Sequence, residues 1–176
     1  MKTISPKGRS ERRDAVLAGA MLLLVINLAT AGDDKVDSLL KDLKDANPGT
    51  RAMAAMTLGK MGPNAKAAVP GLADAVVDRD LNVRYFAAEA LKAVGPGAKA
   101  AVPALIKALN TFPGGSPALE GPQRYYADTR SVAAEALGAI GPGAREAVPA
   151  LKKALNDPDP NVSAVAAEAL KRIQAK

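Results

Sequence analysis

Three glutamates at one position of a repeating pattern are the residues best suited to acid–base chemistry. Glu89, Glu135 and Glu168 each stand in the sequence Ala-Ala-Glu-Ala-Leu, and a pair of carboxylates can act as general acid and base in hydrolysis. The chain has no histidine and no cysteine, which excludes Ser-His-Asp and Cys-His systems and zinc sites made of imidazole or thiolate. Because the glutamates share one repeat position, we interpret them as one exposed face. We expect no catalytic residues, no metal and no cofactor.

A column of basic residues is a candidate binding edge. Lys66, Lys99 and Arg145 follow three successive Gly-Pro turns at the same distance. If the repeats stack at helix-packing distances, these residues form a basic edge that could meet an acidic protein, a phosphate-rich surface or an anionic polymer. The alternative is a solvated edge that keeps the protein soluble, and Glu146, next to Arg145, weakens the basic character.

Aromatic residues gather at one repeat junction and form a second candidate binding site. Aromatic groups and arginine are over-represented at interface hot spots. The chain has three tyrosines, two phenylalanines and no tryptophan. The candidate residues are Tyr85, Phe86, Phe112, Arg124, Tyr125 and Tyr126. Either they recognise a partner, or they fix the inserted segment to which most of them belong.

The N-terminus has the layout of a secretory signal peptide. Five basic residues precede an apolar run, "AVLAGAMLLLVINLA", from Ala15 to Ala29. The sequence Ala29-Thr30-Ala31 then offers a cleavage site before Gly32. The run is shorter than the roughly 20 residues that a spanning helix needs. We therefore predict a cleaved signal at 1–31 and export to the periplasm or the exterior, with no membrane span after cleavage. The alternative is a membrane anchor formed by an uncleaved N-terminal helix.

Internal repeats account for the rest of the chain. Segments that begin at Arg51, Arg84 and Arg130 align without a gap, and a half-repeat begins at Ser163; the spacings are 33, 46 and 33 residues. The sequence thus predicts a repeat domain at 32–176 with a 33-residue period and one 13-residue insertion. Its parts are a helix at 35–45, repeats at 50–77, 82–110 and 128–156, an inserted loop at 111–127 and a half-repeat at 161–175.

Each repeat reads as two amphipathic helices, which position the candidate residues. Apolar residues recur at spacings of three and four, and a Gly-Pro pair ends each first helix. Proline starts each second helix, and Asn47, Asp80 and Asp159 are the expected N-caps of first helices. Single pairs cannot bury their stripes, so the units must stack. We expect an all-α solenoid of about eight helices. Leu170 and Ile173 end it without a following helix, either as an outer helix or as a surface for self-association.

The aligned motifs "VRYFAAEALKAVG", "GPGAREAVPALKKAL" and "DPDPNV" resemble HEAT-like repeats, particularly the short variety named after phycobilisome lyases. The resemblance implies a right-handed curved superhelix whose second helices line the concave side. It also implies a ladder of aspartate and arginine across junctions. Asp45 with Arg51 and Asp78 with Arg84 fit that ladder, whereas the pairs expected at Arg130 and Ser163 do not.

The resemblance implies a protein that binds other macromolecules, and its catalytic members include bilin lyases, which attach or detach tetrapyrroles. Removing residues 1–31 lowers the net charge from +6 to +3, so the chain lacks the concentrated positive charge usual for nucleic-acid binding. We predict an exported, non-catalytic module for protein–protein interaction or scaffolding, with a protein partner and no nucleic acid. The alternative is a bilin lyase-type enzyme or enzyme subunit.

Overall fold

The computed structural model describes residues 34–111 and 129–175, and all of their regular structure is helical. The chain divides into two compact units, Met1–Asp37 and Ser38–Lys176. The second unit contains the repeats and both grooves considered below. Phe112, Arg124, Tyr125 and Tyr126 lie outside the described residues, as does the predicted signal peptide at 1–31.

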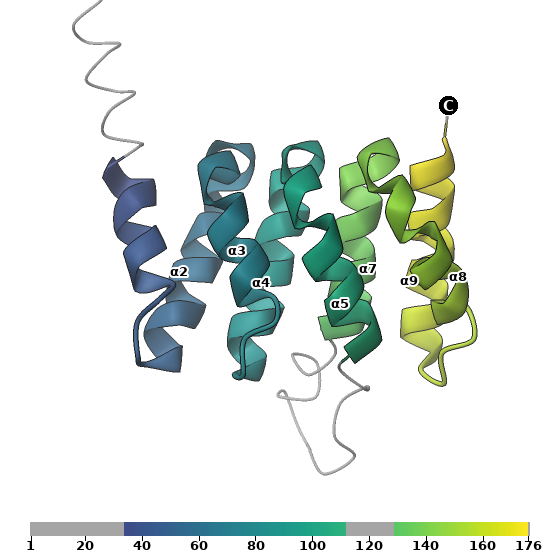
Figure 1. Cartoon of the computed structure of the whole chain (residues 1–176), viewed down its shortest axis with the longest axis horizontal. Coiled ribbons are helices and arrows are strands. Elements are labelled where there is room, and N and C mark those ends of the chain that lie inside the picture. The colour runs from purple at the N-terminus through teal and green to yellow at the C-terminus, as the bar shows by residue number, and fades with distance from the viewer. Residues whose placement is uncertain (1–33, 112–128, 176) are drawn as a thin grey trace, which may run out of the picture. The chain divides into compact units, whose positions relative to one another are not determined.

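The helices form two layers that alternate along the chain. After a helix at 34–42, the first helices of the repeats are α2 (Pro48–Met61), α4 (Leu81–Val94), α7 (Thr129–Ile140) and α9 (Pro160–Gln174). The second helices are α3 (Val69–Ala75), α5 (Val102–Thr111) and α8 (Val148–Ala154). Figure 1 shows α3, α5 and α8 in front of the first-helix layer. The described residues thus contain eight α-helices, which confirms the predicted all-α solenoid.

The turns inside the repeats are themselves helical, which the sequence did not indicate. Short 3₁₀ helices η1 (Gly62–Ala68), η2 (Gly95–Ala101) and η3 (Gly141–Ala147) join first to second helices. Gly62, Gly95 and Gly141 have φ values of 57°, 65° and 68°, a region that L side chains rarely adopt. The expected end of each first helix at Gly-Pro is therefore confirmed.

Both layers contribute to the core, and the six successive helices from α2 to α8 each place one leucine in it. Each of these leucines has no exposed surface, and burying such a side chain contributes about 1.5–3 kcal/mol. They are Leu58, Leu72, Leu91, Leu105, Leu137 and Leu151. At the C-terminal end, Leu170 is 9% exposed and Ile173 is 0% exposed, and α9 packs against both α7 and α8. α9 is thus the outer helix of the last pair, which removes the observation that suggested self-association.

Aspartates and an asparagine fix the loops between repeats. The side chains of Asn47, Asp80 and Asp159 each accept a hydrogen bond from the backbone N–H two residues ahead, at 2.8 to 2.9 Å. They are the N-caps of α2, α4 and α9, as predicted. Two residues before each cap, an aspartate accepts the backbone N–H of the capping residue at 2.7 to 2.9 Å. The motif Asp-x-Asp/Asn therefore both starts the helix and shapes the loop.

Arginine side chains connect one loop to the next, which corrects the predicted ladder. Arg51 Nε and Nη2 donate to the two carboxylate oxygens of Asp78, both at 2.8 Å, and Arg51 Nη1 donates to the backbone oxygen of Asp45 at 2.9 Å. The ionic partner of Arg51 is thus 27 residues ahead, not Asp45. Arg84 likewise donates to the backbone oxygen of Asp78 at 3.0 Å, where a carboxylate pair was expected.

The same arginine link recurs where the sequence indicated that the ladder fails. Arg130 Nη1 lies 2.6 Å from Asp157 Oδ2, again 27 residues ahead, and both side chains are largely buried. A bidentate or buried guanidinium–carboxylate contact fixes the position of both groups. We call Arg51–Asp78 and Arg130–Asp157 the arginine clamps. Burial pushes the pKa of Asp78 upward, but hydrogen bonds from Arg51 and from the backbone of Asp80 outweigh it and lower that pKa below its ordinary value.

Within the described residues, no helix combines the length and the apolar character required to cross a membrane.

Candidate functional site: two equivalent grooves on the first-helix layer

Glycine brings first helices close together at two junctions. Gly59 of α2 faces Ala90 of α4, and a Cβ at position 59 would lie 3.3 Å from the Cα of Ala90. Gly138 of α7 faces Ala169 of α9, and a Cβ there would lie 3.0 Å from the Cα of Ala169. At these distances even a Cβ would require the neighbouring helix to shift, so glycine permits the close approach and forms the floor of each groove.

The two grooves use the same repeat positions. Seven residues of each correspond one to one after a shift of 79 residues along the aligned repeats. The first groove is lined by Met56, Gly59, Lys60, Tyr85, Phe86, Glu89, Ala90 and Ala93. The second is lined by Lys92, Glu135, Gly138, Ala139, Val165, Glu168, Ala169 and Arg172. We call them the aromatic groove and the charged groove.

The aromatic groove combines apolar side chains with one cation, Lys60, and one carboxylate, Glu89. It has a volume of about 310 Å³, and Tyr85 and Phe86 make an edge-to-face contact with ring centroids 5.4 Å apart and planes at 81°, a favourable aromatic geometry. Both rings are partly exposed, and Lys60 is exposed at the last turn of α2. The structure thus places two of the six predicted aromatic-junction residues in a groove, and the gathering of the other four stays a prediction.

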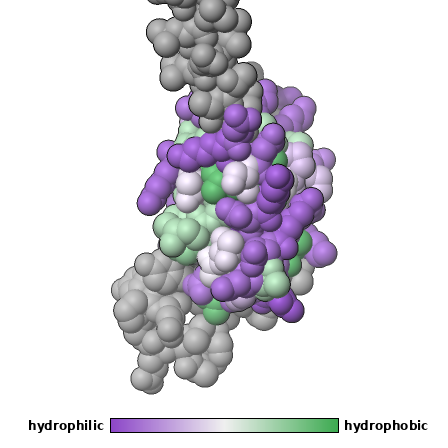
Figure 2. All heavy atoms as spheres, turned by 90° about the vertical axis from the view of Figure 1, so that its left-hand side faces the viewer, coloured by the Kyte–Doolittle hydropathy of each residue, from purple (hydrophilic) through white to green (hydrophobic). Residues whose placement is uncertain are grey.

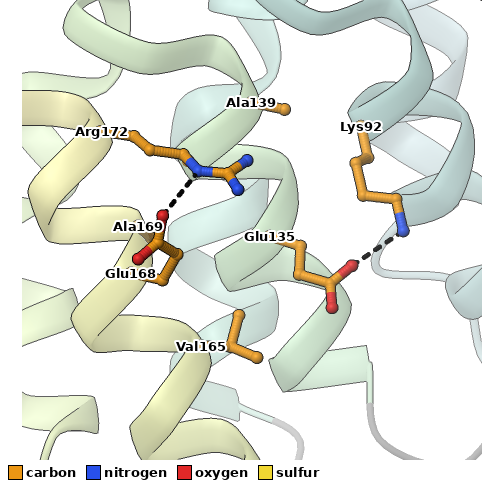
Figure 3. Close-up of a pocket in the computed structure, with 8 residues that line it drawn as sticks. Lys92, Glu135, Ala139, Val165, Glu168, Ala169 and Arg172 are labelled. Carbon is orange, nitrogen blue, oxygen red and sulfur yellow. Dashed lines mark hydrogen bonds and ion pairs between the residues drawn. The ribbon is translucent and has the colours of Figure 1, made fainter.

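Ion pairs occupy the charged groove (Figure 3). Lys92 Nζ lies 2.6 Å from Glu89 Oε1 and 2.8 Å from Glu135 Oε2, and therefore bridges α4 and α7. Arg172 Nε lies 3.1 Å from Glu168 Oε1 on the same helix. Burial lowers the pKa of Lys92, but hydrogen bonds to Glu135 and Glu89 outweigh this and raise the pKa above its ordinary value. The volume of this groove is about 240 Å³.

The three glutamates that the sequence offered for acid–base chemistry all take part in ion pairs. Each is paired with a cation: Glu89 and Glu135 with Lys92, and Glu168 with Arg172. Among the described residues, no group of three or more carboxylates could hold a metal ion. The geometry accounts for the glutamates as part of an ionic surface.

The basic column lies along the 3₁₀ turns. The side chain of Lys66 extends over the next turn, where a Cβ at Gly97 would lie 3.4 Å from Lys66 Cγ, and Lys99 extends over Gly143 in the same way at 3.6 Å. Lys66 and Lys99 line one hollow of about 580 Å³ together with Glu146. Lys66, Lys99 and Arg145 are exposed, and the function of this edge stays a prediction.

Sequence reasoning missed the grooves, although a signal was present. In the aligned repeats, glycine stands at positions 59 and 138, and Lys92 stands at the same position between them. This alternation of glycine and lysine could have been noticed in the sequence, because a glycine within a helix is costly and usually has a packing reason. The grooves themselves could not be predicted from it, since their depth depends on how closely neighbouring helices approach.

Comparison with known proteins places this architecture in a family. The family model for HEAT repeats matches residues 27–114 and 122–176. No match is found among curated proteins. Among solved structures, the complex of CpcE and CpcF of phycocyanin lyase from Nostoc sp. PCC7120 is similar, with 32% identity, a TM-score of 0.64 and coverage of 80% of this chain and 53% of that chain.

Two engineered proteins share the fold. One is 25% identical with a TM-score of 0.57, covering 78% of this chain and 62% of that one. The other is 24% identical with a TM-score of 0.58, covering 80% and 38%. This chain thus spans about half the length of the lyase chain and less than two thirds of either engineered protein. Because the family model covers most of its residues, the chain belongs to the HEAT-repeat family.

Proposed function

We propose that this HEAT-repeat chain is a non-catalytic module that binds another protein. The observation that carries the proposal is exposed apolar surface on the first-helix layer: Met53 of α2 is 58% exposed, and the partly exposed rings of Tyr85 and Phe86 lie on the neighbouring α4. Exposed apolar surface with polar borders is typical of protein interaction sites. Figure 2 shows apolar surface on one flank of the N-terminal end, bordered by hydrophilic side chains.

Capture of a partner tests this function. The chain is immobilised and incubated with an extract of the envelope fraction of the source cells, and bound proteins are identified after washing. A variant in which a short Gly-Ser linker replaces residues 112–126 is treated in parallel. We expect a saturable partner for the chain. Equal recovery by both proteins would exclude the inserted segment from the interaction, and failure to recover any saturable partner would contradict the function.

Export is the second part of the proposal and rests on the N-terminal sequence pattern. We infer that the chain is cut after Ala31 and acts in the periplasm or outside the cell. N-terminal sequencing of the protein from an exported fraction should begin at Gly32. An intact N-terminus on membrane-bound protein would favour the anchored form, and an intact N-terminus on protein from the cell interior would contradict export.

A lyase subunit is the alternative function, and one observation favours it. The chain is 32% identical to a chain of the phycocyanin lyase complex, across about half the length of that chain. On this reading, the full chain changes the absorption spectrum of a linear tetrapyrrole when an acceptor protein is supplied. A spectrum unchanged by the chain, together with capture of a partner, would leave the binding module as the function.

A further inference from the structure

The aromatic groove and the charged groove differ in whether their polar groups are already paired. In the charged groove, Lys92 and Arg172 each lie within 3.1 Å of a glutamate. In the aromatic groove, Glu89 is held by Lys92 from the outside at 2.6 Å. Lys60 is exposed, and no salt bridge joins it to an acidic group of the described chain. The aromatic groove therefore presents Lys60, a cation outside the salt bridges of the described residues, beside apolar surface, while its one carboxylate, Glu89, already has Lys92 as a partner.

The apolar part of this groove extends along α2. Met56 lines the groove, and Met53, one turn earlier on the same helix, is 58% exposed. Phe86 faces the groove from α4. Methionine adapts its shape to different apolar partners, and aromatic rings provide large rigid contact surfaces. This combination suits apolar side chains of a partner.

The size of the groove limits what fits it. A volume of about 310 Å³ is at the lower end of the range of roughly 300–1,000 Å³ found for small-molecule sites. A groove of this size receives one or two anchoring side chains more readily than a large planar cofactor. Anchoring side chains in small pockets are the usual form of hot spots between proteins.

We propose that the aromatic groove binds a peptide segment of the partner that carries apolar anchor residues next to a carboxylate. The anchors lie against Met56 and Phe86, and the carboxylate pairs with Lys60. This inference rests on the proposed protein-binding function and names the chemistry of the partner segment.

Selection from a phage-displayed library of random 12-residue peptides tests the proposal. The full chain is the target, and the affinity of the enriched peptides is then measured by fluorescence anisotropy. We expect the peptides to be enriched in leucine or aromatic residues together with aspartate or glutamate. Lys60→Glu should weaken their binding about tenfold, as for a hot-spot residue. Lys152→Glu, which makes the same change of charge on the exposed face of α8, should leave binding unchanged.

A second variant gives the aromatic groove a carboxylate that the charged groove already has, and is therefore expected to keep the fold. Met56→Glu introduces the residue that the equivalent position 135 already carries, and its carboxylate lies four residues before Lys60, where the two can pair. It should also weaken binding about tenfold. The thermal transition followed by circular dichroism checks that it folds. Glu135→Gln, at the equivalent position of the charged groove, is the matched control and should bind the peptides as the unmodified chain does.

The outcomes separate this inference from the function on which it rests. Absence of enriched peptides, peptides rich in lysine or arginine, or unchanged binding by Lys60→Glu and Met56→Glu would overturn the groove assignment. Concentration-dependent dimers that Met56→Glu abolishes would assign the groove to a second copy of this chain and overturn it too. Capture of a cellular partner equally by the chain and by Met56→Glu would retain the function and reject the groove.

Discussion

The α2–α4 and α7–α9 junctions share one skeleton and differ in surface. Both have an arginine clamp and a glycine that faces an alanine of the next first helix. At the groove positions, however, Met56 and Phe86 of one junction correspond to Glu135 and Val165 of the other. The clamp and glycine determine how the repeats stack, whereas the groove positions vary without changing the backbone. Function is therefore to be sought at the groove positions.

The α4–α7 junction departs from this skeleton. Its spacing is 46 residues instead of 33, and Lys92 occupies the position of the glycine. The residue 27 positions after Arg84 is Thr111, where the clamps have aspartate. Burial lowers the pKa of Arg84, with Asp80 and Asp78 opposing that effect. At this junction Lys92 links the two first helices instead, since it bridges Glu89 of α4 and Glu135 of α7.

The largest effect should come from breaking a clamp. Arg130→Met leaves Asp157 buried without its guanidinium partner, and loss of one member of a buried pair lowers the free energy of unfolding by about 3 kcal/mol. Urea denaturation followed by circular dichroism measures the change. Arg51→Met should destabilise the α2–α4 junction in the same way.

The matched control for the clamps is Arg145→Met, which removes an exposed arginine and should change stability by less than about 0.5 kcal/mol. If Arg130→Met or Arg51→Met lowers the free energy of unfolding by no more than this control does, the two junctions do not depend on a common clamp.

The second effect tests the glycine floors. Alanine favours a helix over glycine by about 1 kcal/mol, so a purely local effect would stabilise both variants. Gly138→Ala places a Cβ 3.0 Å from the Cα of Ala169, and such overpacking costs typically 1–3 kcal/mol. We expect a net loss of stability of about 1 kcal/mol for Gly138→Ala and a smaller loss for Gly59→Ala, where the distance is 3.3 Å. Stabilisation of both variants would mean that the grooves do not depend on close helix approach.

The third effect concerns how the stability of the protein changes as the pH is lowered. Because the pKa of Asp78 is lowered in the folded protein, its contribution to stability is complete above the unfolded value of about 3.9 and is lost as the pH falls through the folded value. We expect Asp78→Asn to be less stable than the unmodified chain at pH 7 and the difference to narrow below about pH 4. Thermal unfolding across this pH range measures it. A constant difference would assign the effect of the substitution to packing.

The sequence predicted the elements and their ends because those depend on local chemistry. Asn47, Asp80 and Asp159 cap helices through backbone groups two residues away, and the glycine of each Gly-Pro pair adopts positive φ. Such contacts are encoded within a few neighbouring residues. The 33-residue spacing of the repeats then predicted that successive helix pairs stack in the order in which they occur along the chain.

The side-chain pairs were harder to predict because they depend on which loops become neighbours. Asp78 is six residues from Arg84 and 27 from Arg51, and the structure pairs its carboxylate with Arg51. Periodicity alone cannot choose between partners one loop apart. The grooves were missed for a related reason, since both Gly59 and Gly138 act through residues of the next repeat. The covering of Leu170 and Ile173 likewise depends on how α9 packs against α7 and α8.

The smallest effect tests whether the ion pairs of the charged groove stabilise the fold or only fill its surface. The side chains of Lys92, Glu89 and Glu135 are 33%, 33% and 41% exposed, and pairs exposed to this degree contribute about 0.5 kcal/mol. Lys92→Met should lower stability by about that amount at low salt, because two glutamates then lose their shared cation. The loss should shrink in 1 M NaCl, where the screening length is about 3 Å.

Lys171→Met is the control for this pair, because its side chain is 78% exposed and its contact with Glu168 is 3.8 Å; it should have almost no effect. A salt-independent loss for Lys92→Met would mean that the short hydrogen bonds of its ammonium to Glu89 and Glu135, made where the other junctions have glycine, hold α4 and α7 together. The irregular junction would then have replaced a close helix contact by a side chain. A loss that salt removes would instead assign Lys92 to the surface, and leave the shared skeleton of the two regular junctions as the source of the stack's stability.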